Sequence, residues 1–174
     1  RKRTAMAQAA QAENVTLVLE PLNPFDDHPG YWLTTMAQAA DIVEDVGNDH
    51  LKILYDIYHQ QLTEGKIIAN LRQYAPLIGH IHVAGAPGRG KLVGGDLDYR
   101  AVFAAIDAVG YTGHVGLEFR AAGHEEAALA EAFPEFFLNQ FTVRGVPLIY
   151  FKGDLALTFT AVSALVLLTH LRGL

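Results

Sequence analysis

Four side chains that are able to bind a divalent metal ion come at the ends of four short apolar runs. Glu20 ends TLVLE, Asp56 ends LKILYD, His82 lies in GHIHVAG, and Glu118 lies in HVGLEFR. Successive members of this set are 36, 26 and 36 residues apart, a size typical of repeated strand and helix units. In a parallel α/β barrel the C-terminal strand ends converge on one mouth, where catalytic groups gather. We therefore predict that the four side chains meet at one ion.

The residue types indicate which ion and which chemistry. Carboxylates with one neutral imidazole favour magnesium, manganese or cobalt, and zinc also fits. Such an ion polarises a carbonyl and its neighbouring hydroxyl, which acidifies the C–H between them. Glu20 and Glu118 are then candidates to carry a proton between adjacent carbons through an enediol. His59, expected in the loop after Asp56, and Arg89, in the glycine-rich loop GAPGRG, are candidates to bind substrate oxygens.

Several of these residues also have a structural interpretation. A single carboxylate at a strand end is often a helix cap or half of an ion pair, and it is the set of four that favours a metal site. His80 is expected on the same strand face as His82, so one of the two is a candidate core histidine. The glycine-rich loop lacks the Gly-Lys-Ser/Thr ending of a P-loop. Four other histidines are expected to be solvated or structural: His28, His50, His114 and His124.

Strand and helix signals alternate along the chain. Short apolar runs predict strands at Thr16–Glu20, Lys52–Tyr58, His80–Ala84 and His114–Phe119. Helical patterns predict helices from the cap Thr34 or Thr35 to Val46, over Glu64–Tyr74, over Tyr99–Val109 after the cap Asp98, over Glu125–Phe133, and at the N-terminus around Ala5, Ala9 and Ala12. Pro21–Tyr31 is a predicted loop. This alternation predicts parallel strands joined by right-handed crossovers.

Composition excludes several classes of function. The chain has 174 residues, about one domain, and 51% of them are hydrophobic. A formal net charge of −6 gives no basic surface for nucleic acid, so a small-molecule substrate is expected. There is no cysteine, which excludes disulfides and thiolate zinc sites and is compatible with the predicted cytoplasmic location. The N-terminal segment does not have the pattern of a secretory signal, and without an initiator Met it is expected to begin inside a longer protein.

Five segments carry a resemblance to a known family. They are LVLEPLNPFDDHPGYWL, LKILYDIYHQQLTEGKI, LIGHIHVAGAPGRG, GDLDYRAVFAAIDAVGYTGHVGLEFR and AGHEEAALA. Over residues 1–132 the chain resembles the C-terminal half of the hydroxypyruvate isomerase family, in the xylose isomerase-like TIM barrel superfamily. That family interconverts hydroxypyruvate and tartronate semialdehyde on a (β/α)8 barrel, and close relatives isomerise 2-oxo-tetronates.

The resemblance implies roles for individual residues. Glu20 and Glu118 match the catalytic glutamates, Asp56 matches a metal ligand, and His59 matches a substrate contact. Hydroxypyruvate isomerases usually carry glutamine at the position of His82, and histidine there is similar to the ketose 3-epimerases. The expected function is thus a hydroxypyruvate isomerase, with a ketose 3-epimerase, a 2-oxo-tetronate isomerase or a non-catalytic remnant as alternatives. A metal-dependent DNA repair nuclease of the same superfamily is disfavoured by the acidic charge balance.

The predicted fold class is α/β, a partial (β/α)8 TIM barrel of about four βα units. A complete barrel takes about 250 residues, and the units here match the fifth to the eighth. Such a half-barrel has two open sheet edges, so we expect a homo-oligomer or association with a missing half-barrel.

The segment 133–174 is predicted to be an apolar tail unrelated to this family. The run 155–171 contains 17 uncharged residues, at the lower limit for a membrane helix. A second possibility is a thioredoxin-like strand and helix without a redox centre, with Pro147 at the position of that family's cis-proline. The third is an apolar segment that covers the exposed barrel surface.

Overall fold

The computed structural model describes residues 1–120, 127, 148–150 and 166–167. The helices are α1 (Lys2–Ala12), α2 (Met36–Val46), α3 (Ile57–Thr63), α4 (Ile67–Tyr74), the short 3₁₀ helix η1 (Ala75–Leu77) and α5 (Tyr99–Ala108). The strands are β1 (Leu17–Leu19), β2 (Leu51–Asp56), β3 (Ile78–Val83), β4 (Val115–Leu117), β5 (Leu148–Tyr150) and β6 (Val166–Leu167).

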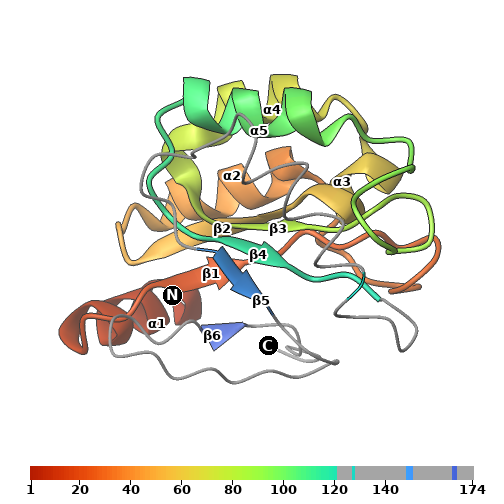
Figure 1. Cartoon of the computed structure of the whole chain (residues 1–174). Helices are drawn as coiled ribbons and strands as arrows, with labels where there is room; N and C mark the ends of the chain where they lie inside the picture. The colour runs from red at the N-terminus through yellow and green to blue at the C-terminus, as the bar shows by residue number, and fades with distance from the viewer. Residues whose placement is uncertain (121–126, 128–147, 151–165, 168–174) are drawn as a thin grey trace.

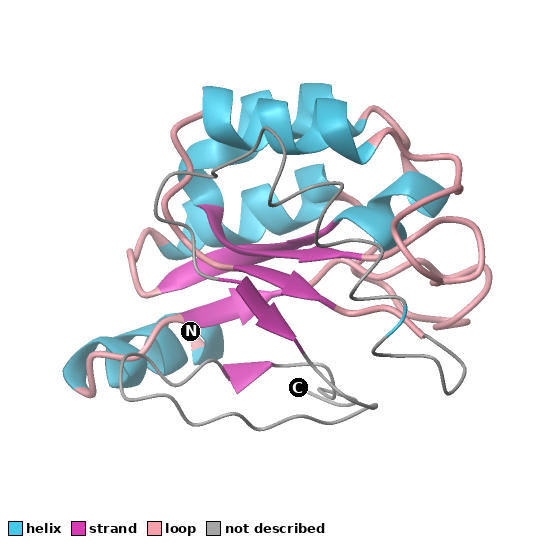
Figure 2. Ribbon diagram, in the orientation of Figure 1, coloured by secondary structure: helices cyan, strands magenta, loops and turns pink. Residues whose placement is uncertain are grey.

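The strands form one parallel sheet in the order β5-β4-β3-β2-β1-β6. The four predicted strands are therefore adjacent and parallel, in chain order, as expected of consecutive βα units. Helices α2 to α5 lie over one face of this sheet, and α1 lies near β1 (Figures 1 and 2). This arrangement confirms the predicted α/β class with parallel strands.

Local signals fix the ends of α2 and α5 as predicted. The side chain of Thr35 accepts a hydrogen bond from the backbone N–H of Gln38 in a capping box, and Gly47 ends α2 in the left-handed conformation. The Asp98 carboxylate accepts from the backbone N–H groups of Arg100 and Ala101 at the start of α5. These caps satisfy backbone donors that no helical carbonyl reaches.

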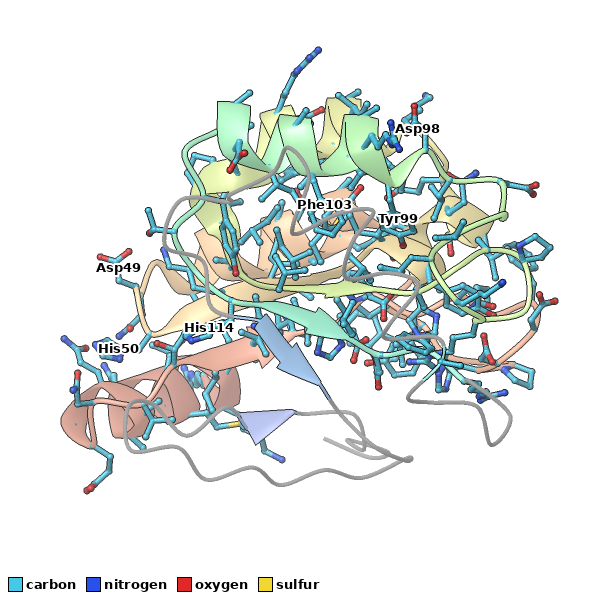
Figure 3. All side chains as sticks on the ribbon, in the orientation of Figure 1. Asp49, His50, Asp98, Tyr99, Phe103 and His114 are labelled. Carbon is cyan, nitrogen blue, oxygen red and sulfur yellow. The ribbon has the colours of Figure 1, made fainter. Side chains whose placement is uncertain are left out.

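Apolar side chains of α5 pack onto the strands that carry the candidate site. Tyr99 and Phe103 project from α5 toward the sheet and are buried (Figure 3). The Tyr99 hydroxyl accepts a hydrogen bond from Ala84 N at 3.1 Å and donates one to Ala84 O. Because Ala84 directly follows β3, this pair of bonds anchors the end of the strand beside His82.

The structure corrects the segment after β2. The strand expected to reach Tyr58 ends at Asp56, and Ile57–Thr63 form α3, so His59 lies in a helix and not in a loop. The cause is local, because the Asp56 carboxylate caps this helix by accepting from His59 N at 3.0 Å. The helix predicted from Glu64 starts later, at Ile67, after Gly65 and Lys66 adopt left-handed conformations.

The N-terminal helix is confirmed, and the structure shows which of its faces is buried. Ala7 and Ala10 pack into the core, whereas Ala5, Ala9 and Ala12 are exposed. Alanine carries little apolar area, so the spacing of alanines alone does not determine which side of a helix is buried.

Both outer strands of the sheet come from the segment after residue 132. β5, within the strand-like run VPLIYF, pairs with β4, and β6 pairs with β1. Val166 and Leu167 are thus in a strand, whereas two of the three possibilities for this segment placed a helix there; the edge of β1 offers backbone hydrogen-bond partners for this strand. Among the described residues, no helix has the length and apolar character to span a membrane. The helix predicted at 125–133 falls outside the described residues, apart from Ala127.

One register irregularity aligns the strand ends. Ile53 pairs with Ile78 but Leu54 pairs with His80, so Gly79 is an extra residue in β3, and Asp56 then aligns with His82. A Cβ atom at Gly79 would lie 2.7 Å from the Cβ of Lys52. The close approach of these two strands therefore requires glycine at this position.

We predict that Gly79→Ala destabilises the protein by about 1–3 kcal/mol, the usual cost of overpacking. The free energy of unfolding from urea denaturation measures this effect. Gly90→Ala is the matched control, because a Cβ there meets nothing within 4 Å and Gly90 has no positive φ. Equal unfolding free energies for the two variants would contradict the prediction.

We also predict that deleting residues 134–174 makes the remaining chain associate. The deletion removes β5 and β6, leaving unpaired N–H and C=O groups along β4 and β1, and such edges template aggregation. Light scattering after size-exclusion chromatography should show larger particles for the truncated chain than for the intact one at equal concentration. A truncated chain of unchanged association state would refute the prediction.

Candidate metal centre

The four predicted ligands come together at the C-terminal ends of adjacent strands. Glu20 directly follows β1, Asp56 ends β2, His82 lies near the end of β3, and Glu118 directly follows β4. One ligand atom from each lies within 4.8 Å of the others. Four residues spread over about 100 positions of sequence thus converge because their strands are parallel and neighbouring.

The Asp56 carboxylate is held in a defined orientation. Its Oδ1 accepts the capping hydrogen bond from His59 N, so its Oδ2 faces the centre. This oxygen lies 3.9 Å from His82 Nδ1 and 3.9 Å from Arg89 Nη2. Asp56 is buried, and one of its oxygens remains directed at the cluster.

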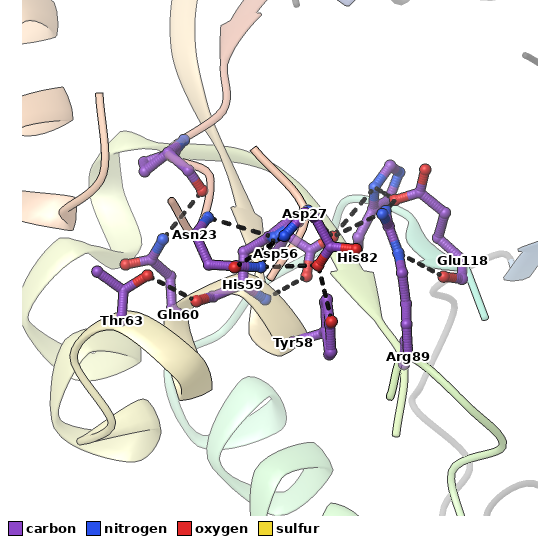
Figure 4. Close-up of polar contacts among 12 residues, drawn as sticks. Asn23, Asp27, Asp56, Tyr58, His59, Gln60, Thr63, His82, Arg89 and Glu118 are labelled. Carbon is purple, nitrogen blue, oxygen red and sulfur yellow. Dashed lines mark hydrogen bonds and ion pairs between the residues drawn. The ribbon is translucent and has the colours of Figure 1, made fainter. Parts of the chain in front are cut away.

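Glu118 is paired with two positive or polarisable groups. Its Oε2 lies 2.8 Å from His82 Nδ1 and 2.8 Å from Arg89 Nη2, and Figure 4 shows the three side chains directed toward one another. Burial by itself raises the pKa of Glu118, but the contacts with His82 and Arg89 outweigh this effect and lower the pKa to about 2. Glu118 is therefore ionised at neutral pH.

Arg89 is presented by the glycine-rich loop. Gly85 and Gly90 exchange two backbone hydrogen bonds, and Arg89 adopts a positive φ of 55° just before this closure. Its guanidinium lies 5.5 Å from the ring centroid of Tyr58, and its Nε donates to Glu118 O at 3.3 Å. The loop thus directs a cation at the carboxylate cluster.

Glu20 has a different electrostatic environment. It is buried, and its Oε1 has no hydrogen-bond partner among the residues that the structure describes. Burial and the nearby charges of Asp56 and Glu118 raise its pKa well above the ordinary value of 4.5. The two glutamates of the cluster are therefore shifted in opposite directions.

This donor set fits a divalent cation. Three carboxylates and one imidazole supply hard oxygen donors and a nitrogen, the chemistry that Mg²⁺, Mn²⁺ or Co²⁺ accept. A buried glutamate without a hydrogen bond is costly, and a cation between the carboxylates would remove that cost. Glu20, Asp56, His82 and Glu118 are the residues that would hold it.

His59 lies next to this cluster within a network that the sequence did not predict. It is fully buried, and its Nε2 is 3.9 Å from Asp56 Oδ2. Its Nδ1 lies 2.8 Å from Nδ2 of Asn23, and Asn23 in turn contacts Asp27, which accepts from the Tyr58 hydroxyl at 2.7 Å. A polar residue in a proline-rich loop, Asn23, was the one sequence feature that could have suggested this network. Because Asn23 and His59 are 36 residues apart, the sequence did not predict their contact.

The remaining histidines lie in three different settings. His80 is buried edge-on to His82 with ring centroids 4.8 Å apart, and burial lowers its pKa to about 3, which fits the core role considered for it. His50 and His114 lie at the other end of the sheet (Figure 3). His28 is nearer the site than expected, since its ring centroid is 5.3 Å from that of His59. His124 falls outside the described residues.

Comparisons with known proteins identify relatives of the chain. A family model described as a xylose isomerase-like TIM barrel matches residues 3–139. Hydroxypyruvate isomerase of Escherichia coli (strain K12) is 40% identical over 123 residues, which are 71% of this chain and 47% of the relative. The 2-oxo-tetronate isomerase of Cupriavidus necator is 38% identical over 123 residues, with the same two coverages of 71% and 47%.

Solved structures agree with the fold. The crystal structure of an AP endonuclease, family 2, from Brucella melitensis aligns with a TM-score of 0.72 and 28% identity, over 76% of this chain and 51% of that one. The structure of L-ribulose 3-epimerase aligns with a TM-score of 0.61 and 30% identity, over 80% of this chain and 45% of that one. The chain spans about half the length of the proteins it matches.

We predict that Mn²⁺ affinity, measured by isothermal titration calorimetry, rises with pH above 4.5. The raised pKa of Glu20 means that this carboxyl must lose a proton before it binds metal, so affinity increases by up to about tenfold per pH unit until that pKa is passed. Glu20→Gln should weaken Mn²⁺ binding and abolish the release of the Glu20 proton that accompanies it. Glu13→Gln, at an exposed position, is the control, and an identical pH profile in Glu20→Gln would exclude Glu20 as a ligand.

Proposed function

Because the chain belongs to the xylose isomerase-like TIM barrel family, we propose that it carries the metal centre of an isomerase that converts hydroxypyruvate to tartronate semialdehyde. The observation that carries this proposal is the convergence of Glu20, Asp56, His82 and Glu118 within 4.8 Å. The 40% identity to a hydroxypyruvate isomerase supports the choice of substrate. The proposed ion is Mg²⁺, Mn²⁺ or Co²⁺, with Zn²⁺ as a further possibility.

The reaction requires proton transfer between two neighbouring carbons. A proton leaves C3 of hydroxypyruvate, a proton is delivered to C2, and the hydroxyl proton passes from O3 to O2. When bound, the metal ion supplies Lewis acidity that lowers the pKa of the C–H bond next to the carbonyl. In our proposal Glu118, which is ionised at neutral pH, removes the C3 proton. Glu20, which follows β1 on the other side of the cluster, delivers the proton to C2.

Two further residues are proposed to bind the substrate. Arg89 is a half-buried cation beside Glu118, and a guanidinium can bind a carboxylate such as that of hydroxypyruvate with two hydrogen bonds. His59 has its Nε2 on the side of Asp56 that faces the centre. Together they would orient the substrate between Glu20 and Glu118.

Enclosure of the substrate requires the rest of a barrel. Water exclusion needs walls on all sides, and the described strands β1 to β4 supply one side only. We propose that residues 1–132 form the C-terminal half of the barrel, that 133–174 form a separate apolar tail, and that a second copy or a missing half-barrel completes the site. The proposed location is the cytoplasm.

A ketose 3-epimerase is the second candidate. His82 occupies a ligand position, contacting Glu118 at 2.8 Å, and the sequence pattern with histidine there is similar to that of the epimerases. The likeness to L-ribulose 3-epimerase supports this candidate, and that to 2-oxo-tetronate isomerase supports a related acid substrate. Comparing hydroxypyruvate, L-ribulose and a 2-oxo-tetronate as substrates separates these possibilities from a non-catalytic remnant, which would turn over none of them.

We predict that Glu118→Gln preserves the fold, weakens metal affinity and lowers turnover of hydroxypyruvate by about 100-fold or more. The loss follows because glutamine keeps the shape of the side chain but cannot accept the C3 proton. Turnover in D2O, followed by NMR, measures both product and deuterium incorporation at carbon.

The matched control is Glu44→Gln, an exposed glutamate on α2 outside the site, which should leave turnover unchanged. An active preparation in which Glu118→Gln has the rate of the control would show that another group is the base. Absence of turnover and of deuterium exchange in the intact, Mn²⁺-loaded chain would favour the remnant.

A further inference from the structure

A partly buried chain of hydrogen bonds lies beside the candidate metal centre. It runs from Tyr58 through Asp27 and Asn23 to His59 (Figure 4). The Tyr58 hydroxyl donates to Asp27 Oδ2 at 2.7 Å, and Asn23 Nδ2 donates to the same oxygen at 2.9 Å. Asn23 and His59 are both fully buried, so each polar atom of their side chains needs a partner within the protein.

The orientation of the Asn23 amide is fixed by its neighbours. Its Oδ1 accepts hydrogen bonds from the backbone N–H groups of Asp26 at 2.9 Å and Asp27 at 3.4 Å. Backbone N–H groups only donate, so the atom that faces them must be the amide oxygen. The other atom, Nδ2, is then the donor to the Asp27 carboxylate, which only accepts.

This orientation determines the tautomer of His59. The second hydrogen of Asn23 Nδ2 faces His59 Nδ1 at 2.8 Å, and the backbone N–H of Asn23 faces the same nitrogen at 3.4 Å. A ring nitrogen that accepts hydrogen bonds carries no proton. The proton of His59 is therefore on Nε2.

The Nε2–H group of His59 is directed toward the candidate site. Nε2 lies 3.9 Å from Asp56 Oδ2, beyond hydrogen-bond distance, and it has no hydrogen-bond partner among residues 1–120 and the other described positions. A buried donor without an acceptor costs free energy. A substrate oxygen placed beside Asp56 would supply that acceptor.

We propose that Asn23 is a positioning residue that holds His59 with its proton on Nε2, so that this nitrogen donates a hydrogen bond to a substrate oxygen. The part concerning substrate rests on the proposed function, whereas the tautomer depends only on the hydrogen bonds of Asn23. With the opposite tautomer, Nε2 would present a lone pair to a substrate oxygen and to the Asp56 carboxylate, which is repulsive. Asp27 and Tyr58 support Asn23 in this role.

The tautomer is measured by long-range ¹H–¹⁵N correlation NMR of the intact chain with ¹⁵N-labelled histidine. We expect the His59 signal to show an unprotonated Nδ1 and a protonated Nε2 at neutral pH. His59→Gln identifies the signal by removing it from the set of eight histidines. A wild-type His59 with its proton on Nδ1, or with protons on both nitrogens, would overturn the proposal.

A double substitution reverses the direction of the key hydrogen bond without changing charge or size. In Asn23→Asp with Asp27→Asn, the new amide at position 27 donates to the carboxylate at position 23, and Tyr58 can accept from that amide. The carboxylate at position 23 then offers only acceptors to His59. We expect the proton of His59 to move to Nδ1, and its retention on Nε2 would refute the role of Asn23.

Asn70→Ala is the control for a general effect of losing a buried asparagine. Asn70 is buried in α4, and its side chain interacts with Tyr55. This variant should keep the wild-type tautomer, whereas Asn23→Ala should give a mixture of the two. A changed His59 tautomer in Asn70→Ala as well would show that loosened packing, and not Asn23, controls it.

Kinetics test the part that concerns substrate. With hydroxypyruvate, the double substitution should lower kcat/KM by about tenfold or more, because a donor to substrate becomes an acceptor. Mn²⁺ affinity should stay unchanged, since the four ligands are intact. A reversed tautomer with unchanged kcat/KM would refute the contact with substrate. If the wild-type chain turns over no substrate, the proposed function fails, and the NMR result alone decides the role of Asn23.

Discussion

The hydrogen bond from His59 N–H to Asp56 Oδ1 joins the fold to the site. Asp56 is at once the last residue of β2 and the cap of α3. One carboxylate oxygen therefore starts the helix, and the geometry of the cap directs the other toward the metal-ligand cluster. The same bond places His59 in the first turn of α3, with its ring beside the cluster and in contact with Asn23 of the loop after β1. Strand end, helix start and loop are thus positioned by one side chain.

Electrostatics explain why this cluster is suited to a cation. Three carboxylates converge where two of them, Glu20 and Asp56, are buried, and their mutual repulsion is only partly compensated by Arg89 and His82. The compensation is uneven. Arg89 and His82 contact Glu118 directly and lower its pKa, whereas Glu20 has no such contact, so burial and its acidic neighbours raise its pKa. A divalent ion bound in the cluster would attract both carboxylates and so reduce the difference between the electrostatic environments of Glu20 and Glu118.

The parallel sheet is built from two parts of the chain that differ in composition. β1 to β4 carry the site at their C-terminal ends, while β5 and β6 come from the apolar segment after residue 132 and pair with the outer edges of β4 and β1. In a complete barrel those edges pair with further barrel strands. The chain covers about half the length of its relatives, and in this structure β5 and β6 pair with the two edges of the set β1 to β4.

The sequence by itself determined the parallel α/β class, the cap at Asp98, a cap at Thr34 or Thr35, and the four metal-ligand candidates, because periodicity, capping residues and strand-end carboxylates are local signals. It did not determine that α3 begins directly after Asp56, or that Ala7 and Ala10 form the buried face of α1. Only the tertiary structure decided the contact between Asn23 and His59, which are 36 residues apart, and the opposite pKa shifts of Glu20 and Glu118. The physical reason is that burial and pairing depend on which side chains the packed strands and loops bring together, and spacing along the chain does not specify those distances.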